Sequence, residues 1–209
     1  MGLLRFIAGQ LRKPSGFIGR HVVAKMLNAG NRPMNRLTLA SLGLTPDDRV
    51  LEVGFGGGDL VHRMAAVVTH GCIAGVDFSP EMVDGCTKRF AALLRAERLE
   101  LRCASAEHLP YDSGYFTKAC TVNTLYFWPD PLGPLNELRR VLRPGGRLVL
   151  CFNPRTTLQR AGYTKYGFRL YECAEVQRLL ETAGFASVRM VPGASLLGEF
   201  SCAVGTRET

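Results

Sequence analysis

The chain is predicted to fold as a single α/β domain built on a doubly wound, mostly parallel sheet. Short apolar runs of strand length alternate with longer stretches of helical periodicity. A glycine-rich turn at residues 54–58 follows directly on the apolar run 50–53, and the next apolar run, Cys72–Asp77, ends in a carboxylate. With 209 residues and 46% hydrophobic content, the chain can bury a substantial core in one domain.

The glycine-rich turn predicts a cofactor site. The run 50–53 is typical of a buried strand, and the glycines after it allow a sharp turn and leave the backbone open to a ligand. Asp59 is the expected N-cap of the helix that follows. A strand, a glycine turn and a helix N-terminus together form a cradle at the carboxyl end of a parallel strand.

The spacing of the glycines indicates the kind of cofactor. Gly54, Gly56 and Gly58 are spaced G-x-G-x-G, whereas a dinucleotide site requires G-x-G-x-x-G. Glu52, which lies within the strand, would repel a pyrophosphate but could attract an ammonium group. Asp77 follows the turn by about 20 residues, where a carboxylate can bind both ribose hydroxyls. The pattern favours a nucleoside cofactor with a cationic amino-acid tail, and it disfavours a nucleotide-dependent oxidoreductase.

The remaining elements continue the alternation. Helices are expected at residues 17–28, 33–42, 60–68, 80–96, 135–142 and 172–183. Strands are expected at Leu99–Cys103 and at residues 117–122, 147–152, 188–191 and 200–205. Residues 153–169 form the longest irregular connection and are expected to act as a flap.

Three segments resemble the motifs of one family. Residues 52–58 (EVGFGGG) look like motif I of the class I S-adenosylmethionine (SAM)-dependent methyltransferases, residues 76–82 (VDFSPEM) like their motif II, and residues 142–148 (LRPGGRL) like their post-core turn. In its motifs and their order, the chain resembles the type 11 methyltransferases, which are similar to the quinone-biosynthesis C-methyltransferases. The resemblance covers roughly residues 35–205. The resemblance implies a Rossmann-like seven-stranded sheet of order 3-2-1-4-5-7-6 with the last strand antiparallel. It also implies SAM as cofactor and S-adenosylhomocysteine as product.

The resemblance further implies which residues bind the cofactor. These are Glu52, Gly54, Phe55, Gly56, Gly58, Asp77, Phe78, Met82, Ser105, Ala106, Glu107 and Asn123. Ser105 stands where the family has an aspartate near the adenine amino group, in a stretch that reads ASAEHLP at residues 104–110. A hydroxyl without charge makes a weaker contact than a carboxylate. We therefore expect a lower affinity for SAM, and a SAM-binding protein without activity is an alternative to an enzyme.

The acceptor side is less sharply defined. The segment after residue 122 borders the methyl acceptor in the family, which makes Tyr126 and Trp128 candidate walls of the acceptor pocket, although such aromatics can equally close the core. Tyr163 and Tyr166 are candidate acceptor contacts from the flap. The flap cations, which could bind an anionic acceptor or simply be solvated, are Arg155, Arg160, Lys165 and Arg169.

Methyl transfer from SAM requires no nucleophilic side chain, because the enzyme mainly aligns the acceptor with the methyl group and excludes water. A general base helps only when the acceptor must lose a proton, and the candidates are His21 and Tyr126. The seven cysteines form no C-x-x-C pair, so metal and disulfide sites are not expected, and buried reduced thiols fit a cytoplasmic protein.

Positive charge is concentrated at the N-terminus. Residues 1–46 carry seven Lys and Arg and no Asp or Glu, which leaves a net charge of +1 for residues 47–209. We expect residues 1–46 to form a helical lid over a SAM-binding core at 47–209. Alternatively, residues 1–36 form a basic amphipathic surface that docks on an anionic membrane or an acidic substrate, which would make the protein membrane-peripheral. Nucleic acid is not favoured as a partner, because no aromatic-rich recognition motif accompanies the charge.

The sequence thus predicts a SAM-dependent methyltransferase that acts on a small, aromatic or apolar acceptor. A membrane-lipid or quinone methyltransferase that uses the basic N-terminal region is the alternative. No apolar run reaches the roughly 18 residues that a membrane span requires. The acceptor atom and the oligomeric state stay open.

Overall fold

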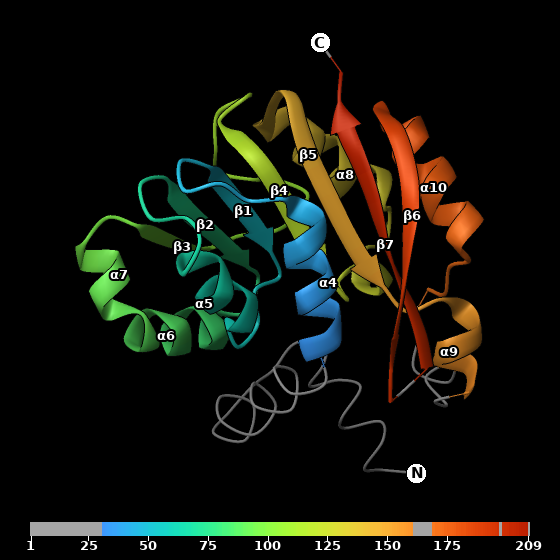
Figure 1. Ribbon diagram of the computed structural model, residues 1–209, viewed down its shortest axis with the longest axis horizontal. Coiled ribbons are helices and arrows are strands. Elements are labelled where there is room, and N and C mark those ends of the chain that lie inside the picture. The colour runs from blue at the N-terminus through green and yellow to red at the C-terminus, as the bar shows by residue number, and fades with distance from the viewer. Residues whose placement is uncertain (1–30, 161–168, 197, 209) are drawn as a thin grey trace.

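A computed structural model describes residues 31–160, 169–196 and 198–208, and these form one seven-stranded sheet with helices on both faces (Figure 1). The strand order is β3-β2-β1-β4-β5-β7-β6, as predicted. Neighbouring strands are parallel from β3 to β5, and β7 runs antiparallel to both β5 and β6. The strands are β1 (Arg49–Val53), β2 (Cys72–Asp77), β3 (Leu99–Cys103), β4 (Phe116–Val122), β5 (Leu142–Phe152), β6 (Phe185–Ser195) and β7 (Gly198–Arg207).

Most of the described helices lie close to their predicted positions, but helix α9 (Arg155–Arg160) lies within residues 153–169, which were expected to be irregular. The described helices are α4 (Arg32–Leu42), α5 (Asp59–Ala65), α6 (Pro80–Arg89), α7 (Ala91–Arg95), the 3-10 turn η2 (Leu125–Phe127), α8 (Leu132–Val141), α9 and α10 (Cys173–Thr182). The prediction of one helix over residues 80–96 was wrong, because the chain leaves helical geometry at Phe90 (φ −108°, ψ 23°). The Phe90 ring packs under Gly58, so a long-range contact breaks the helix there.

The strands of the C-terminal half extend beyond their predicted bounds. β5 begins at Leu142 rather than at Arg147, because the pairing with β4 continues through the post-core turn by way of a register shift. β6 and β7 are also longer than predicted, because they pair with each other almost throughout. Partner strands therefore extend these elements beyond their apolar centres.

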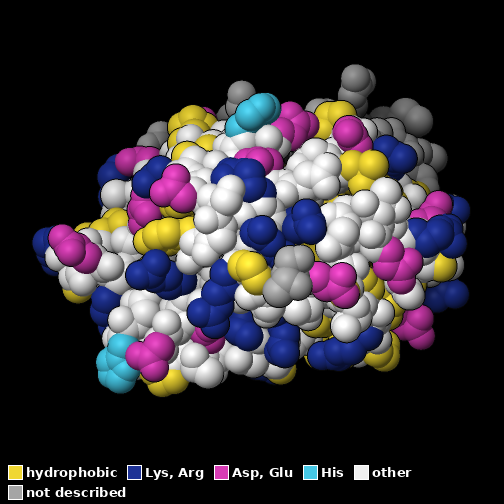
Figure 2. All heavy atoms as spheres, turned by 90° about the horizontal axis from the view of Figure 1, so that it is seen from above, with side chains coloured by type: hydrophobic (Ala, Val, Ile, Leu, Met, Phe, Trp, Pro, Cys, Tyr) yellow, Lys and Arg dark blue, Asp and Glu magenta, His cyan; other side chains and the backbone are white. Residues whose placement is uncertain are grey.

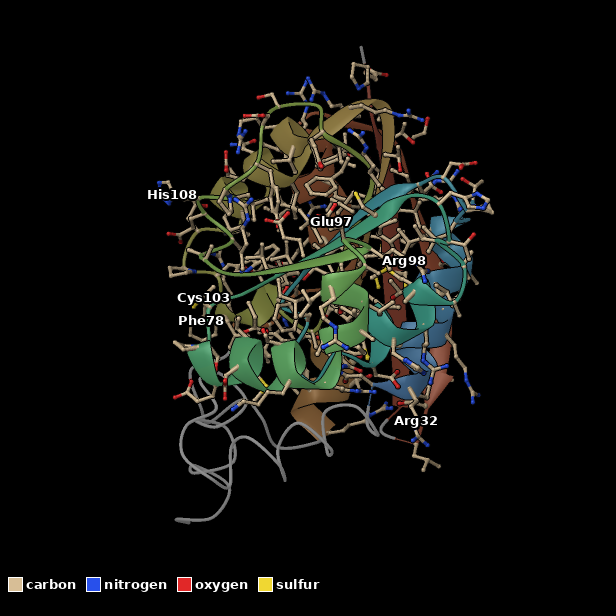
Figure 3. The ribbon with its side chains drawn as sticks, turned by 90° about the vertical axis from the view of Figure 1, so that its left-hand side faces the viewer. Arg32, Phe78, Glu97, Arg98, Cys103 and His108 are labelled. Carbon is tan, nitrogen blue, oxygen red and sulfur yellow. The ribbon has the colours of Figure 1, made fainter. Side chains whose placement is uncertain are left out.

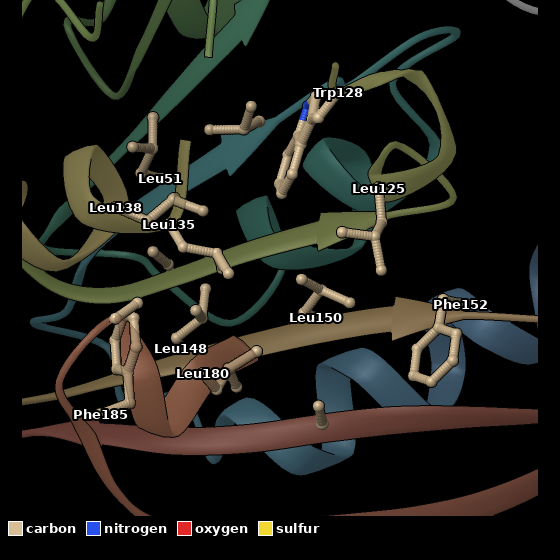
Figure 4. Close-up of a cluster of buried hydrophobic side chains, with 14 of the residues drawn as sticks. Leu51, Leu125, Trp128, Leu135, Leu138, Leu148, Leu150, Phe152, Leu180 and Phe185 are labelled. Atoms are coloured by element: carbon tan, nitrogen blue, oxygen red, sulfur yellow. The ribbon is translucent and has the colours of Figure 1, made fainter. Parts of the chain in front are cut away.

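The core lies on both faces of the sheet because successive strand side chains point to opposite sides. Leu51 and Val53 of β1 join the cluster that lies between the sheet and helices α8 and α10 (Figure 4). Val50 joins the cluster on the opposite face, beneath α4, α5 and α6. Glu52 shares the parity of Val50, so this carboxyl group is directed to the α5 side of the sheet.

Helix α4 packs directly on the sheet. It lies on the near face of the sheet in Figure 1, contacts β4, β5 and β7, and buries Met34, Thr38 and Leu42. Its C-terminus is held by Arg147, whose Nη1 donates to the carbonyls of Ser41 (3.2 Å) and Leu42 (3.1 Å). The described part of the predicted N-terminal lid, helix α4, therefore packs on one face of the sheet. Residues 1–30, with the helix predicted at 17–28, lie outside the described residues.

The end of the sheet opposite the glycine loop is basic. Figure 2 looks onto this end and shows Lys and Arg side chains gathered over its middle. Arg49, Lys118 and Arg143 lie at or near the amino ends of β1, β4 and β5. Burial, together with the positive charges of Arg147 and Arg143, lowers the pKa of Lys118. Local crowding of cations thus occurs even where the net charge of residues 47–209 is close to zero.

Candidate active site

The glycine loop after β1 requires glycine for geometric reasons. Gly54, Gly56 and Gly58 have φ angles of 77°, 50° and 72°, which side chains rarely adopt. A Cβ atom at Gly54 would collide with the Cγ2 of Thr124, just beyond β4. The loop therefore lies at the carboxyl end of β1 and packs against the segment that follows β4.

Asp77, the last residue of β2, holds this loop. Its Oδ2 accepts a hydrogen bond from the Gly56 N–H (2.8 Å) and its Oδ1 accepts one from the Ser79 N–H (3.0 Å). Burial raises the pKa of the Asp77 carboxyl group, and these hydrogen bonds oppose the rise. Asp77, the residue predicted to bind the ribose, thus lies against the glycine loop, and both of its carboxylate oxygens accept hydrogen bonds from backbone amides.

Glu52 is a buried carboxyl group beneath the loop. Its side chain is 3% exposed, and its Oε2 is buried without a hydrogen-bond partner among the described residues. Burial raises the pKa of Glu52 to about 8, and the carboxylates of Asp77 and Asp59 add to the shift. Because an orphaned carboxylate oxygen is costly to bury, this position fits a cationic ligand group.

Helix α6 supports the loop from behind. The Arg89 Nη1 donates to the carbonyl of Gly57 (2.5 Å), and the Cys86 Sγ donates to the carbonyl of Gly56 (3.4 Å). Burial raises the pKa of Cys86 to about 12, which keeps this thiol protonated as a donor. Neither residue was predicted from the sequence. The signal was their helical spacing from Met82, which puts Met82, Cys86 and Arg89 on neighbouring positions of one face.

Asp59 is not the N-cap of α5, contrary to prediction. Gly58 is the cap, and Asp59 is the first helical residue. The Asp59 Oδ2 accepts hydrogen bonds from the Asn35 Nδ2 (2.9 Å) and the Arg63 Nε (2.8 Å). These partners lower the pKa of Asp59 against the effect of its burial. Through Asn35, helix α4 is tied to the first turn after the glycine loop.

An apolar surface lies beyond Asp77. Phe78 is 47% exposed, and Figure 3 shows Phe78 and Cys103 together where β2 and β3 end. The Cys103 Sγ donates to the carbonyl of Phe78 (3.7 Å). Ser105 follows on the next loop, where its Oγ accepts a hydrogen bond from the Glu107 N–H (3.2 Å). An exposed aromatic ring beside a carboxylate fits the base and ribose of a nucleoside.

Other predicted cofactor residues lie at different depths. Phe55 and Met82 are buried in the apolar cluster on the α5 side of the sheet. Ala106 packs against the edge of the other cluster, and Glu107 is exposed. Of the predicted residues, the structure brings Glu52, Gly54, Gly56, Gly58 and Asp77 together around one loop, with Phe78 next to Asp77.

Asn123 lies directly after β4 in the left-handed region (φ 58°) and begins a polar cluster. Its Oδ1 accepts hydrogen bonds from the Tyr126 hydroxyl (3.1 Å) and the Asn153 Nδ2 (3.0 Å). Its Nδ2 donates to the Asn31 Oδ1 (2.9 Å) and the Met34 Sδ (3.2 Å). Asn31, Met34 and Asn153 were not predicted, because they join Asn123 only when α4 and the ends of β4 and β5 come together.

The predicted acceptor residues that the structure describes are buried. Tyr126 and Trp128 are 5% and 8% exposed and belong to the apolar cluster beneath α8 and α10. Burial raises the pKa of Tyr126, which disfavours the phenolate that a base would require. The predicted residues that lie outside the described part of the chain are His21, Tyr163, Lys165 and Tyr166.

The two ends of the flap are tied to the surrounding structure. The Arg155 N–H donates to the carbonyl of Tyr171 (2.9 Å), and the Arg155 Nη2 contacts the Glu175 Oε2 (2.8 Å). The Arg169 guanidinium lies over the Tyr171 ring, 5.4 Å from its centroid, and donates to the carbonyl of Pro129 (3.3 Å). Both arginines therefore have structural partners.

Neither a metal site nor a membrane span is found in the described part of the chain. No group of three His, Cys, Asp or Glu residues is arranged to hold an ion there. None of the described helices combines the length and the apolar character needed to cross a bilayer. All seven cysteines are free thiols.

Residues 51–150 match the methyltransferase domain family. The chain is 28% identical to the uncharacterized methyltransferase YdaC of Bacillus subtilis, in a match that covers 64% of this chain and 72% of that protein. It is 30% identical to the ubiquinone/menaquinone biosynthesis C-methyltransferase UbiE of Geobacter sp., over 60% of this chain and 54% of that protein. It is 32% identical to the demethylmenaquinone methyltransferase of Clavibacter sepedonicus, over 68% and 57%. The chain thus spans little more than half the length of these last two relatives.

Two solved structures share the fold. One is the Haloferax volcanii protein in complex with the Trm112 methyltransferase activator, with a TM-score of 0.78, 18% identity, and coverage of 89% of this chain and 93% of that chain. The other is the geranyl diphosphate C-methyltransferase of Streptomyces coelicolor, with a TM-score of 0.72, 16% identity, and coverage of 95% and 87%. The sheet order, the glycine loop and these matches agree: the chain has the fold of the class I SAM-dependent methyltransferases, and residues 51–150 match a methyltransferase domain.

Proposed function

We propose that this protein binds SAM at the glycine loop and transfers its methyl group to a small acceptor that lies over the carboxyl ends of β4 and β5. The observation that carries the proposal is the loop itself. Three left-handed glycines keep it bare, and Asp77 and Arg89 hold it from two sides. A loop fixed by this many contacts is preorganised for a ligand.

The surrounding residues suit the parts of SAM. Phe78 offers its exposed ring to the adenine, and Asp77 lies where ribose hydroxyls can be bound. Glu52, whose Oε2 has no partner among the described residues, is protonated in the cofactor-free protein near neutral pH. A bound ammonium group would favour its ionised form, which then provides negative charge for that group. When bound, SAM supplies an electrophilic methyl group and its own leaving group. The residues therefore need only to hold the two reactants in line and to exclude water.

The acceptor is proposed to be a small aromatic or apolar metabolite. Quinone-biosynthesis methyltransferases among the relatives support a quinol-like ring as one such acceptor. A membrane-lipid or quinone substrate reached through the basic N-terminal region is the second candidate, and the seven cations of residues 1–46 favour it. A SAM-binding protein without activity is the further alternative that Ser105 suggests.

Calorimetric titration with SAM and with S-adenosylhomocysteine, using NAD as control, tests the cofactor. Micromolar binding of both and no binding of NAD is expected. Failure of both in a folded sample would end the enzyme proposal. Turnover is then tested with radiolabelled methyl-SAM against quinol, phenol and lipid acceptor pools, where binding without any labelled product would support the inactive SAM-binding protein.

Membrane docking is tested separately. Co-sedimentation of the full chain with vesicles of anionic phospholipid is compared with that of a variant lacking residues 1–30. Loss of binding on deletion would support the membrane-docking candidate, and the absence of binding by the full chain would exclude it.

A further inference from the structure

In the polar cluster at the ends of β4 and β5, the hydrogen bonds of Asn123 determine which groups donate and which accept. Asn123 uses its Oδ1 as acceptor toward Tyr126 and Asn153, and its Nδ2 as donor toward Asn31 and Met34. A carboxamide has one acceptor oxygen and one donor nitrogen. These four contacts therefore set the orientation of the neighbouring amides as well.

With the amides oriented in this way, one polar atom of the Asn153 side chain has no hydrogen-bond partner among the described residues. Its Nδ2 donates to the Asn123 Oδ1 (3.0 Å) and reaches the Met34 Sδ (3.7 Å). Its backbone N–H donates to the Tyr126 hydroxyl, and its carbonyl lies 3.2 Å from the same hydroxyl. The Oδ1 of Asn153 accepts no hydrogen bond from the described residues, although the side chain is only 7% exposed. This oxygen is not among the fully buried polar atoms that lack a partner, so it can be reached from outside the core and can accept a hydrogen bond from a ligand.

The position of Asn153 matches the expected place of the acceptor. Asn153 directly follows β5, and Asn123 directly follows β4 and donates its backbone N–H to the carbonyl of Cys151 (2.9 Å). In open α/β sheets, ligands bind outside the carboxyl ends of the strands. The glycine loop lies next to the same edge, because Gly54 packs on Thr124. Cofactor and cluster therefore share one end of the sheet.

We propose that Asn153 recognises the methyl acceptor by accepting a hydrogen bond at Oδ1 from a hydroxyl or N–H group of a neutral molecule. The proposal rests on the proposed methyl transfer and specifies its substrate class. Asn153 is a specificity-determining residue in this role, and Asn123, Tyr126 and Met34 position it. The opposite end of the cluster, the Asn31 Nδ2, donates to no described residue and offers a donor for an acceptor oxygen on the same molecule.

The charges around the cluster favour a neutral acceptor. The cluster consists of carboxamides, a phenol and a thioether, and none of these groups is charged near neutral pH. Of the described flap arginines, Arg155 and Arg169 already bind Glu175 and the Pro129 carbonyl with the Tyr171 ring, and Arg160 is exposed at the end of α9. Arg32, which follows Asn31, is exposed, and its charge acts on Asp59. A diphosphate, such as the geranyl diphosphate in complex with the Streptomyces coelicolor protein, would need cations or a metal at this place.

Binding to protein loaded with S-adenosylhomocysteine tests the proposal with probes that differ in one donor. The probes are 1-naphthol and 1-methoxynaphthalene, measured by titration, with geranyl diphosphate plus Mg²⁺ as the anionic probe. The expected result is that 1-naphthol binds about fivefold more tightly than its methyl ether, the effect of one neutral hydrogen bond. The diphosphate is expected to bind more weakly than 1-naphthol.

Three variants test whether Asn153 causes the preference for 1-naphthol over 1-methoxynaphthalene. Asn153→Leu removes both amide functions and is expected to abolish the preference, whereas Asn153→Asp keeps an acceptor oxygen and is expected to retain it. Thr157→Val removes a nearby buried hydroxyl that donates to the Glu199 carbonyl (2.8 Å), and it should leave the preference unchanged. Each variant is first titrated with S-adenosylhomocysteine, which monitors the cofactor site and the fold.

The outcomes are separable. A fivefold preference that persists in Asn153→Leu would overturn the proposal, as would equal binding of the two naphthalenes, no binding of either, or tighter binding of the diphosphate by the parent protein. Failure of the parent to bind S-adenosylhomocysteine would instead overturn the proposed function itself. Loss of the preference in Asn153→Leu, with its retention in Asn153→Asp and Thr157→Val, would support Asn153 as the recognition residue.

Discussion

The Oδ2 of Asp77 accepts a 2.8 Å hydrogen bond from the backbone N–H of Gly56, so the carboxylate that ends β2 fixes the loop that follows β1. The two residues are 21 positions apart in the sequence, yet their motifs form one structural unit. Because both elements end at the same edge of the sheet, a ligand that contacts one of them necessarily approaches the other.

Replacing Asp77 by Ala should weaken SAM binding by about 1.5–3 kcal/mol, the scale of a lost hydrogen bond to a charged group. Asp77→Asn is the matched control, because its Oδ1 can still accept from Gly56 while the charge is gone, and it should fall between the parent and Asp77→Ala. Calorimetric titration with SAM measures both. An unchanged dissociation constant for Asp77→Ala would show that this carboxylate does not contribute to cofactor binding.

Replacing Arg89 by Met should weaken SAM binding by about 1 kcal/mol, because the carbonyl of Gly57 loses its donor and the loop becomes less ordered. Arg95→Met is the control, since Arg95 is an exposed arginine of α7, outside the helix that supports the loop. Both are compared with the parent by titration with S-adenosylhomocysteine. Equal affinities in all three proteins would mean that Arg89 stabilises α6 without organising the loop.

The stability of the cofactor-free protein should fall as pH rises through the range set by Glu52. Its folded pKa of about 8 lies above the value of 4.5 for an exposed glutamate. Between these values the folded state keeps a proton that the unfolded state has lost. The free energy of unfolding should therefore decrease with pH, by up to about 1.4 kcal/mol per pH unit from this group.

Glu52→Gln removes that titration and leaves Asp59 and Asp77 in place. Urea unfolding of parent and variant from pH 5 to pH 8 gives the difference in slope, and the variant should lose less stability across this range. Parallel pH profiles would show that Glu52 is already ionised in the folded protein at pH 5.

Much of the fold followed from local patterns. The glycine loop, β2 and the alternation of strands and helices depend on residues that are close together in the sequence, and the sheet order followed from the resemblance of those segments to one family. Features that depend on distant contacts were not predictable in this way. The break at Phe90 exists because its ring packs under Gly58, and no helix breaker marks it in the sequence.

The residues of the candidate site likewise fall into those predictable from local sequence motifs and those that only the fold brings together. Glu52, Gly54, Gly56, Gly58 and Asp77 carry recognisable spacing, and the structure gathers them at one loop. Asn153 carries no motif, and its unused oxygen becomes apparent only when Asn123, Tyr126 and α4 are seen to consume the other hydrogen-bonding groups. The sequence left open whether Tyr126 and Trp128 line the acceptor pocket or close the core, because their burial on the α8 side is set by three-dimensional packing.

Gly54→Ala should both destabilise the fold and weaken SAM binding. The new methyl group would meet the Thr124 Cγ2, and the φ angle of 77° is unfavourable for alanine. A backbone strained in this way costs on the order of 1–3 kcal/mol. Gly85→Ala is the matched control, because Gly85 lies in α6 with no described atom within 4 Å of the added Cβ. Alanine there should stabilise the helix by about 0.5–1 kcal/mol.

The double variant Gly54→Ala/Thr124→Ala separates the two causes. It removes the Cγ2 that the new methyl group would meet but keeps the unfavourable φ, so it should recover only part of the lost stability. Urea unfolding and SAM titration measure the four proteins together. If Gly54→Ala proved as stable as Gly85→Ala and bound SAM like the parent, the close packing of the glycine loop on the β4 end would not be a requirement of the site.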